Sequence, residues 1–161
     1  MRKLVIEKSA VKNNLAVIKE RAAGAVIYGV LSGDGGGAGI AALAQLLRDE
    51  GIGHFAVSEV SEAQALREAG FVDEEILMLR STTDREELER LVDLNAVCTI
   101  SSVDTGMALN ALAENRSTVV EAHIQVDTGM GFGGFLVGEP EKILLAYRSL
   151  PNVALSGIYT Q

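Results

Sequence analysis

Two patterns of apolar residues alternate along the chain. Short, nearly continuous apolar runs are typical of strands, and segments in which an apolar residue recurs every three or four positions are typical of helices. Residues 4–6 form a short apolar run, and residues 9–21 then place their apolar side chains on one helical face. Residues 25–31 are almost continuously apolar, which predicts a strand covered on both faces. A helical spacing begins at Ile40, and Gly51 follows it as the expected C-cap.

The same alternation continues toward the C-terminal end. Further strands are expected at residues 54–57, 76–79, 96–100, 119–126 and 153–159, with helical spacings at residues 60–66, 88–92, 108–112 and 143–147. Thr83 and Glu86 have the spacing of a capping box before the helix at 88–92. Strands that alternate with helices predict an α/β fold with a parallel sheet and right-handed crossovers.

Two architectures fit this alternation, an open doubly wound sheet and a parallel (β/α) barrel. A TIM barrel needs eight strands and about 250 residues. A chain of 161 residues is then a partial barrel of about six of the eight strands. No linker or low-complexity tract interrupts the pattern, so we expect a single domain over residues 1–161.

Composition narrows the classes of function. The chain is 48% hydrophobic and carries a net charge of −8, which argues against disorder and against nucleic acid or anionic membranes as partners. No apolar run approaches the roughly 20 residues of a membrane span, and the N-terminus lacks a signal-peptide core. The single cysteine, Cys98, lies in an apolar run and is expected to be a buried thiol in a cytoplasmic, disulfide-free protein.

A glycine-rich turn at residues 32–39 separates a strand from a helix, which is where α/β proteins usually bind ligands. Gly33, Gly35 and Ala38 satisfy G-x-G-x-x-A, and Glu59 has about the spacing of a ribose-binding carboxylate. Chance matches are common in so glycine-rich a run, and the alternative is a turn without a ligand. No lysine follows the glycines, which excludes a P-loop.

A second glycine-rich loop at residues 126–134 also follows a strand. Asp127 and Thr128 there either contact a ligand or, for Asp127, cap local N–H groups. The two histidines, His54 and His123, lie on strands and are expected to be packed, and no spacing of metal ligands is present. Ser32 lacks the G-x-S-x-G context of a nucleophile.

Together these loops resemble the N-terminal domain of alanine racemase. That family consists of fold-type III pyridoxal-phosphate enzymes with a (β/α)₈ barrel and a separate C-terminal β-domain. Residues 30–39, V-L-S-G-D-G-G-G-A-G, are in register with the family's V-V-K-A-[DN]-A-Y-G-H-G. Residues 126–130, V-D-T-G-M, and 157–160, G-I-Y-T, match later signature loops, so the resemblance covers the whole chain.

The departures from the family pattern fall at its cofactor-contacting positions. Ser32 stands at the position of the Schiff-base lysine, and a hydroxyl cannot form an imine with the cofactor aldehyde. Gly36 replaces a phosphate-contacting tyrosine and Ala38 a histidine. Phe132 replaces the arginine that contacts the cofactor phenolate, and Gln161 stands where a histidine stacks on the pyridine ring.

The resemblance therefore implies a racemase fragment that is catalytically inactive and does not bind pyridoxal phosphate covalently. It also implies that the last two barrel strands and the C-terminal domain are absent, which leaves two open edge strands and predicts homo-oligomers. The first strand of one copy is expected to approach the last strand of another. Two alternatives stay open: a non-catalytic scaffold whose strand-end pocket is empty or binds an anion, and an NAD-binding oxidoreductase domain that uses Glu59.

Overall fold

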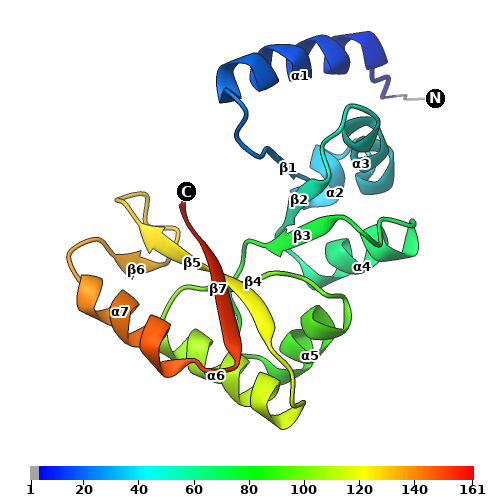
Figure 1. The fold of residues 1–161 in the computed structure, drawn as a ribbon. Helices are drawn as coiled ribbons and strands as arrows, with labels where there is room; N and C mark the ends of the chain where they lie inside the picture. The colour runs from blue at the N-terminus through cyan, green and yellow to red at the C-terminus, as the bar shows by residue number, and fades with distance from the viewer. Residues whose placement is uncertain (1–3) are drawn as a thin grey trace. The chain divides into compact units, whose positions relative to one another are not determined.

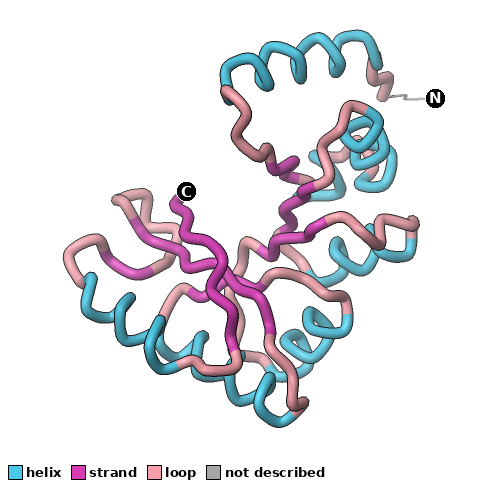
Figure 2. The backbone as a smooth tube through the Cα atoms, viewed as in Figure 1, coloured by secondary structure: helices cyan, strands magenta, loops and turns pink. Residues whose placement is uncertain are grey.

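A computed structural model describes residues 4–161, and helices and strands alternate along this part of the chain (Figures 1 and 2). The elements are α1 (Lys8–Ala22), β1 (Tyr28–Val30), α2 (Ser32–Gly36), α3 (Ile40–Asp49), β2 (His54–Val57), α4 (Val60–Glu68), β3 (Glu75–Met78), α5 (Arg85–Asp93), β4 (Cys98–Ile100), α6 (Val103–Asn115), β5 (Val120–Asp127), β6 (Phe135–Leu136), α7 (Pro140–Ser149) and β7 (Val153–Thr160). They form two compact units, one reaching to Ile76 and one starting at Leu77. The expectation of a single domain over residues 1–161 stays a prediction.

The first unit is organised on the strand order β1-β2-β3. β1 runs parallel to β2, with Tyr28 opposite His54 and Val30 opposite Ala56. In the core, Phe55 meets Phe71 edge to face with ring centroids 5.7 Å apart. Helix α3 buries an apolar stripe at the helical spacing that the sequence predicts, which packs this helix onto the unit.

The second unit is centred on β5, which pairs in parallel with β4, β6 and β7. The pairing of β5 with β7 shifts register between Ala122 and His123. The Tyr159 hydroxyl on β7 lies 3.0 Å from Thr99 Oγ1 on β4 and donates to the Leu79 carbonyl at 3.0 Å. One side chain from β7 thus contacts both β4 and the segment that follows β3.

The expected fold class is confirmed, because the chain is α/β with parallel strands and the strands of residues 4–161 form no closed barrel. This arrangement is consistent with a partial barrel. No helix within these residues is long and apolar enough to cross a membrane.

Two strand predictions near the N-terminus need correction. Residues 4–6 form no strand, because no neighbouring strand pairs with them and their side chains are exposed. The strand expected at residues 25–31 shortens to Tyr28–Val30, and Val26 and Val30 are exposed. Among the described strands β1 pairs with β2 alone, so its apolar run is not buried on both faces.

The capping box expected at Thr83 and Glu86 is also wrong. Asp84 is the N-cap of α5, and its Oδ1 accepts the Glu87 N–H at 2.9 Å. The Thr82 hydroxyl oxygen in turn accepts the Asp84 N–H at 3.0 Å. The N-cap of α5 is therefore Asp84, one residue after the Thr83 of the motif. The two-residue strand β6 was not predicted.

Candidate functional site

The first glycine-rich loop folds into a left-handed turn. The angle φ is positive at five consecutive residues, including Gly33 (67°), Asp34 (54°) and Gly36 (66°). Glycine adopts this conformation without steric cost, and aspartate tolerates it better than most residues. A Cβ atom on Gly36 would meet nothing within 4 Å, so backbone conformation, and not space, favours glycine there.

The turn satisfies its own backbone groups. The Gly39 N–H donates to the Asp34 carbonyl at 2.9 Å, and the Ile40 N–H donates to Asp34 Oδ1 at 2.8 Å. The Gly35 N–H donates to the Leu31 carbonyl at 2.8 Å. Asp34 therefore joins the turn to the start of α3 with both its backbone and its side chain.

Glu62, in the first turn of α4, which follows β2, closes the turn. Its Oε1 accepts the N–H groups of Gly33 at 2.6 Å and Asp34 at 3.3 Å. Its Oε2 accepts those of Ser58 at 3.0 Å and Glu59 at 3.1 Å. A carboxylate of the chain itself thus occupies the loop amides that an external anion would need.

Sequence reasoning missed Glu62, although a signal was present. Glu62 lies three residues after Glu59, the N-cap of α4, and the two form a capping box. The dinucleotide interpretation had given Glu59 to a ribose hydroxyl. The structure instead uses Glu59 to start a helix.

Ser32 lies at the carboxyl end of β1 and is half-buried. Its Oγ lies 2.7 Å from the Oγ of Ser58, which follows β2. One neutral hydroxyl does not deprotonate another at neutral pH, so this pair supplies neither an activated nucleophile nor an amine.

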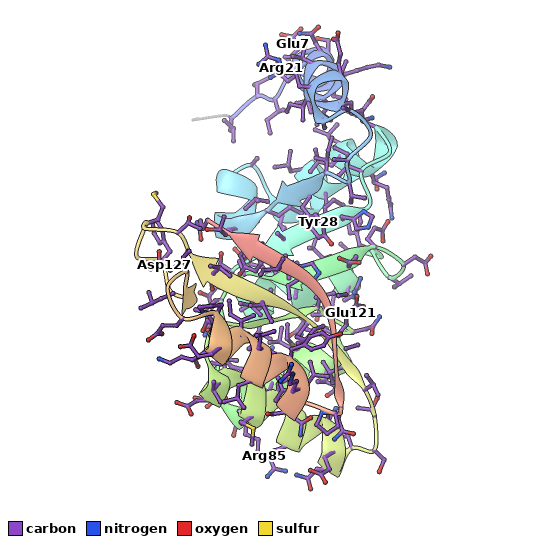
Figure 3. All side chains as sticks on the ribbon, turned by 60° about the vertical axis from the view of Figure 1, so that its left-hand side comes forward. Glu7, Arg21, Tyr28, Arg85, Glu121 and Asp127 are labelled. Atoms are coloured by element: carbon purple, nitrogen blue, oxygen red, sulfur yellow. The ribbon has the colours of Figure 1, made fainter. Side chains whose placement is uncertain are left out.

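The second glycine-rich loop is also closed on its own carboxylate. Asp127, at the end of β5 (Figure 3), accepts the N–H groups of Gly129 at 2.8 Å and Gly131 at 3.1 Å with Oδ1. These bonds hold the pKa of Asp127 below its usual range. The interpretation of Asp127 as a local cap is confirmed.

A buried amide supports the same loop from beneath. The Gln125 side chain is 4% exposed, and its Nε2 donates to the Phe132 carbonyl at 3.3 Å. The Phe132 ring itself is 61% exposed. Phe132 therefore contacts Gln125 through its backbone carbonyl and not through its ring. The sequence did not predict this role of Gln125, because a single glutamine in an apolar strand forms no recognisable motif.

The predicted site residues fall into two pairs. Ser32 and Gly36 belong to the first loop, in the first unit. Phe132 and Gln161 belong to the second unit, where Thr128 Oγ1 lies 2.7 Å from Thr160 Oγ1 and so joins the second loop to the end of β7. Gln161 follows Thr160 directly and is exposed.

The histidines and the cysteine behave as structural residues. The His54 ring packs edge-on to Tyr28 with centroids 5.1 Å apart, and His123 lies directly against Gly157. Cys98 is buried, and burial raises the pKa of its thiol to about 12. Within residues 4–161, no three His, Cys, Asp or Glu side chains are grouped as a metal site.

Comparison with known proteins gives consistent results along the chain. Residues 6–161 match the family model described as alanine racemase, N-terminal domain. The alanine racemase of Carboxydothermus hydrogenoformans is 33% identical over 93% of this chain and 40% of the relative. The chain thus spans about 40% of the length of such curated relatives.

Solved structures agree with this assignment. The alanine racemase of Clostridium difficile 630 in complex with cycloserine superposes with a TM-score of 0.83 at 28% identity, over 91% of this chain and 40% of that one. The alanine racemase of Bartonella henselae with covalently bound pyridoxal phosphate superposes with a TM-score of 0.85 over 96% of this chain and 45% of that one, and at 21% identity supports the fold alone. The chain therefore belongs to the alanine racemase N-terminal domain family.

Proposed function

We propose that this chain is a racemase-fold domain that neither attaches pyridoxal phosphate covalently nor racemises amino acids. The observation that carries the proposal is Ser32. In the register of the family motif it stands at the position of the Schiff-base lysine, and its hydroxyl contacts the hydroxyl of Ser58. A serine cannot supply the amine that an imine requires.

The surroundings of Ser32 do not fit the cofactor either. The amides of Gly33 and Asp34 already bind the Glu62 carboxylate, which would repel a phosphate group. None of the chain's lysines lies in either glycine-rich loop. In the second loop, the side chain of Phe132 has no positive charge with which to bind the phenolate of the cofactor. We therefore assign no step of the family reaction to these residues.

These same contacts argue against the other two functions. An anion-binding scaffold would need free loop amides, and Glu62 and Asp127 accept amides in both loops. An NAD site would need Glu59 for a ribose, and Glu59 is part of the capping box of α4.

The test compares the chain with a Ser32→Lys variant after incubation with pyridoxal phosphate and borohydride reduction. Peptide mapping is expected to show a reduced adduct at residue 32 in the variant and none there in the original chain. Ser58→Lys serves as the matched control for adding a lysine to the same hydroxyl pair. Racemisation of alanine by the unmodified chain would refute the proposal.

A further inference from the structure

Helix α1 contacts the rest of the first unit through lysine side chains and a buried leucine. Within the described residues, Leu15 alone is buried on this helix. Lys12 Nζ lies 3.8 Å from Glu50 Oε1, and Lys19 Nζ donates to the backbone carbonyl of Glu50. Two lysines about two turns apart on one helix thus contact the same residue, the C-cap of α3.

The charges on the two sides of this contact are complementary. α1 carries four lysine and arginine residues and one glutamate. The end of α3 that lies beside it carries Asp49 and Glu50, and the helix dipole adds partial negative charge there. Arg48, the cation at the same end, pairs with Glu74 at 3.2 Å and stacks over the ring of Phe71. Charge therefore favours the docked position of α1, and dissolved salt screens this attraction.

The packing beneath α1 is incomplete. An open cavity of about 160 Å³ lies between α1 and α3, lined by Lys8, Lys12, Asp49 and Glu50 among others. A second open cavity, of about 220 Å³, is bordered by Lys19, residues 25–27 and residues 51–54. Side chains that border a cavity lack the close contacts of a packed core, so dispersion adds little to the lysine contacts here.

The segment after α1 provides a hinge. Ala23, the C-cap of α1, has a φ of 50°, and Gly24 has a φ of 87°. The left-handed region is strained for alanine, so a change of conformation at Ala23 relieves this strain. Residues 23–27 form neither helix nor strand before β1 begins. We propose that α1 is a strap that is held closed by the attraction of its lysines to Glu50 and opens about this hinge as ionic strength rises.

Opening of the strap changes the surface of the first unit. It removes one wall from each of the two cavities and exposes Leu15. It also uncovers Leu46 and Ile52, which line these cavities on the opposite side. A change in ionic strength is thereby converted into exposure of apolar side chains.

The experiment measures hydrogen exchange of the full chain by mass spectrometry in about 20 mM and about 500 mM sodium chloride, which shortens the screening length severalfold. An unstructured reference peptide in the same buffers corrects for the effect of salt on intrinsic exchange. Amides of α1 are expected to exchange about threefold faster at the higher salt concentration, the effect of losing one exposed ion pair. Amides of α4, in the same unit, are expected to keep their rate.

Charge reversal identifies the contact. Lys12→Glu and Glu50→Lys should each raise α1 exchange at low salt, and the double variant should restore slow exchange, because the pair forms again with opposite polarity. Lys142→Glu is the matched control. Lys142 also pairs with a glutamate, Glu139 at 2.8 Å, but lies on α7, so this variant should leave α1 exchange unchanged.

Three results would overturn the proposal. One is an exchange rate of α1 that is the same at both salt concentrations. Another is a double variant in which α1 exchanges as fast as in either single variant, since this ion pair would then not hold the helix. The third is equal acceleration of α1 and α4, which would mean that the whole unit opens. Should circular dichroism show that Glu50→Lys does not fold, Lys12→Glu and the salt comparison of the unmodified chain decide the question.

Discussion

Glu62 and Asp127 have the same role in the two glycine-rich loops. Each carboxylate accepts backbone N–H groups from a loop that follows a parallel strand. The positive φ angles of the first loop turn the amides of Gly33 and Asp34 toward Glu62. The loops are therefore stabilised from within the chain and need no bound anion to hold their shape.

Removing the charge of Glu62 should destabilise the first unit. Glu62→Gln keeps one acceptor oxygen but loses the second, so at least two of the four N–H groups lose their partner. We expect the free energy of unfolding to fall by about 2 kcal/mol, because hydrogen bonds to charged groups are among the stronger ones. Urea denaturation measures this, and Glu68→Gln on the same helix is the control. Equal stability of the two variants would show that the Glu62 contacts contribute little.

Tyr159 should make the stability of the second unit depend on alkaline pH. Burial, the largest cause, raises the pKa of its hydroxyl above the usual value. A raised pKa gives stability that is complete below the unfolded pKa of about 10 and is lost as pH rises through the folded pKa.

Tyr159→Phe should lower the free energy of unfolding by about 1 kcal/mol at neutral pH, through loss of the bonds to Thr99 and Leu79. The variant should also lose less stability than the unmodified chain above about pH 10. Denaturant titrations at both pH values test this, with the exposed Tyr147→Phe as the control. Parallel pH profiles for the Tyr159→Phe variant and the unmodified chain would contradict it.

At the scale of elements, the pairing of β5 and β7 depends on one glycine. A Cβ atom on Gly157 would lie 2.6 Å from three atoms of the His123 ring, on the strand opposite. A methyl group at residue 157 therefore forces either the His123 ring or the strand backbone to shift.

Gly157→Ala should destabilise the chain by about 1–3 kcal/mol, the usual cost of overpacking. Gly138→Ala is the matched control, because its Cβ would meet nothing within 4 Å and its φ is not positive. Thermal unfolding followed by circular dichroism compares the two. A Gly157→Ala variant as stable as Gly138→Ala would show that the His123 ring moves freely.

At the scale of the whole molecule, the sequence predicted what depends on local periodicity. Helix α3 and strand β7 lie where the apolar spacing placed them, because α3 buries one side and β7 alternates half-buried with exposed side chains along its pairing with β5. The family motif also placed Ser32 at a strand end. These features need only neighbours in sequence or a known pattern.

Features that depend on distant neighbours were not predicted. Residues 4–6 are as apolar as a strand but have no strand beside them. Glu62 contacts Gly33 from 29 positions away, and Gln125 supports a loop through a backbone carbonyl. Neither contact leaves a pattern in the sequence, since any carboxylate or amide at that place in space would serve.

Protection against hydrogen exchange should vary strongly along the molecule. Strand β5 has hydrogen-bonded neighbours on both sides, whereas α1, within the described residues, buries Leu15 alone, has no side-chain cap, and contacts Glu50 through Lys12 and Lys19. Regions with few buried apolar contacts open at low free energy. At low protein concentration, α1 should exchange first and the centre of β5 last, as measured by mass spectrometry. Protection of α1 equal to that of β5 would contradict this prediction, because it would show that α1 is held as firmly by its own unit as the central strand is held by its neighbours.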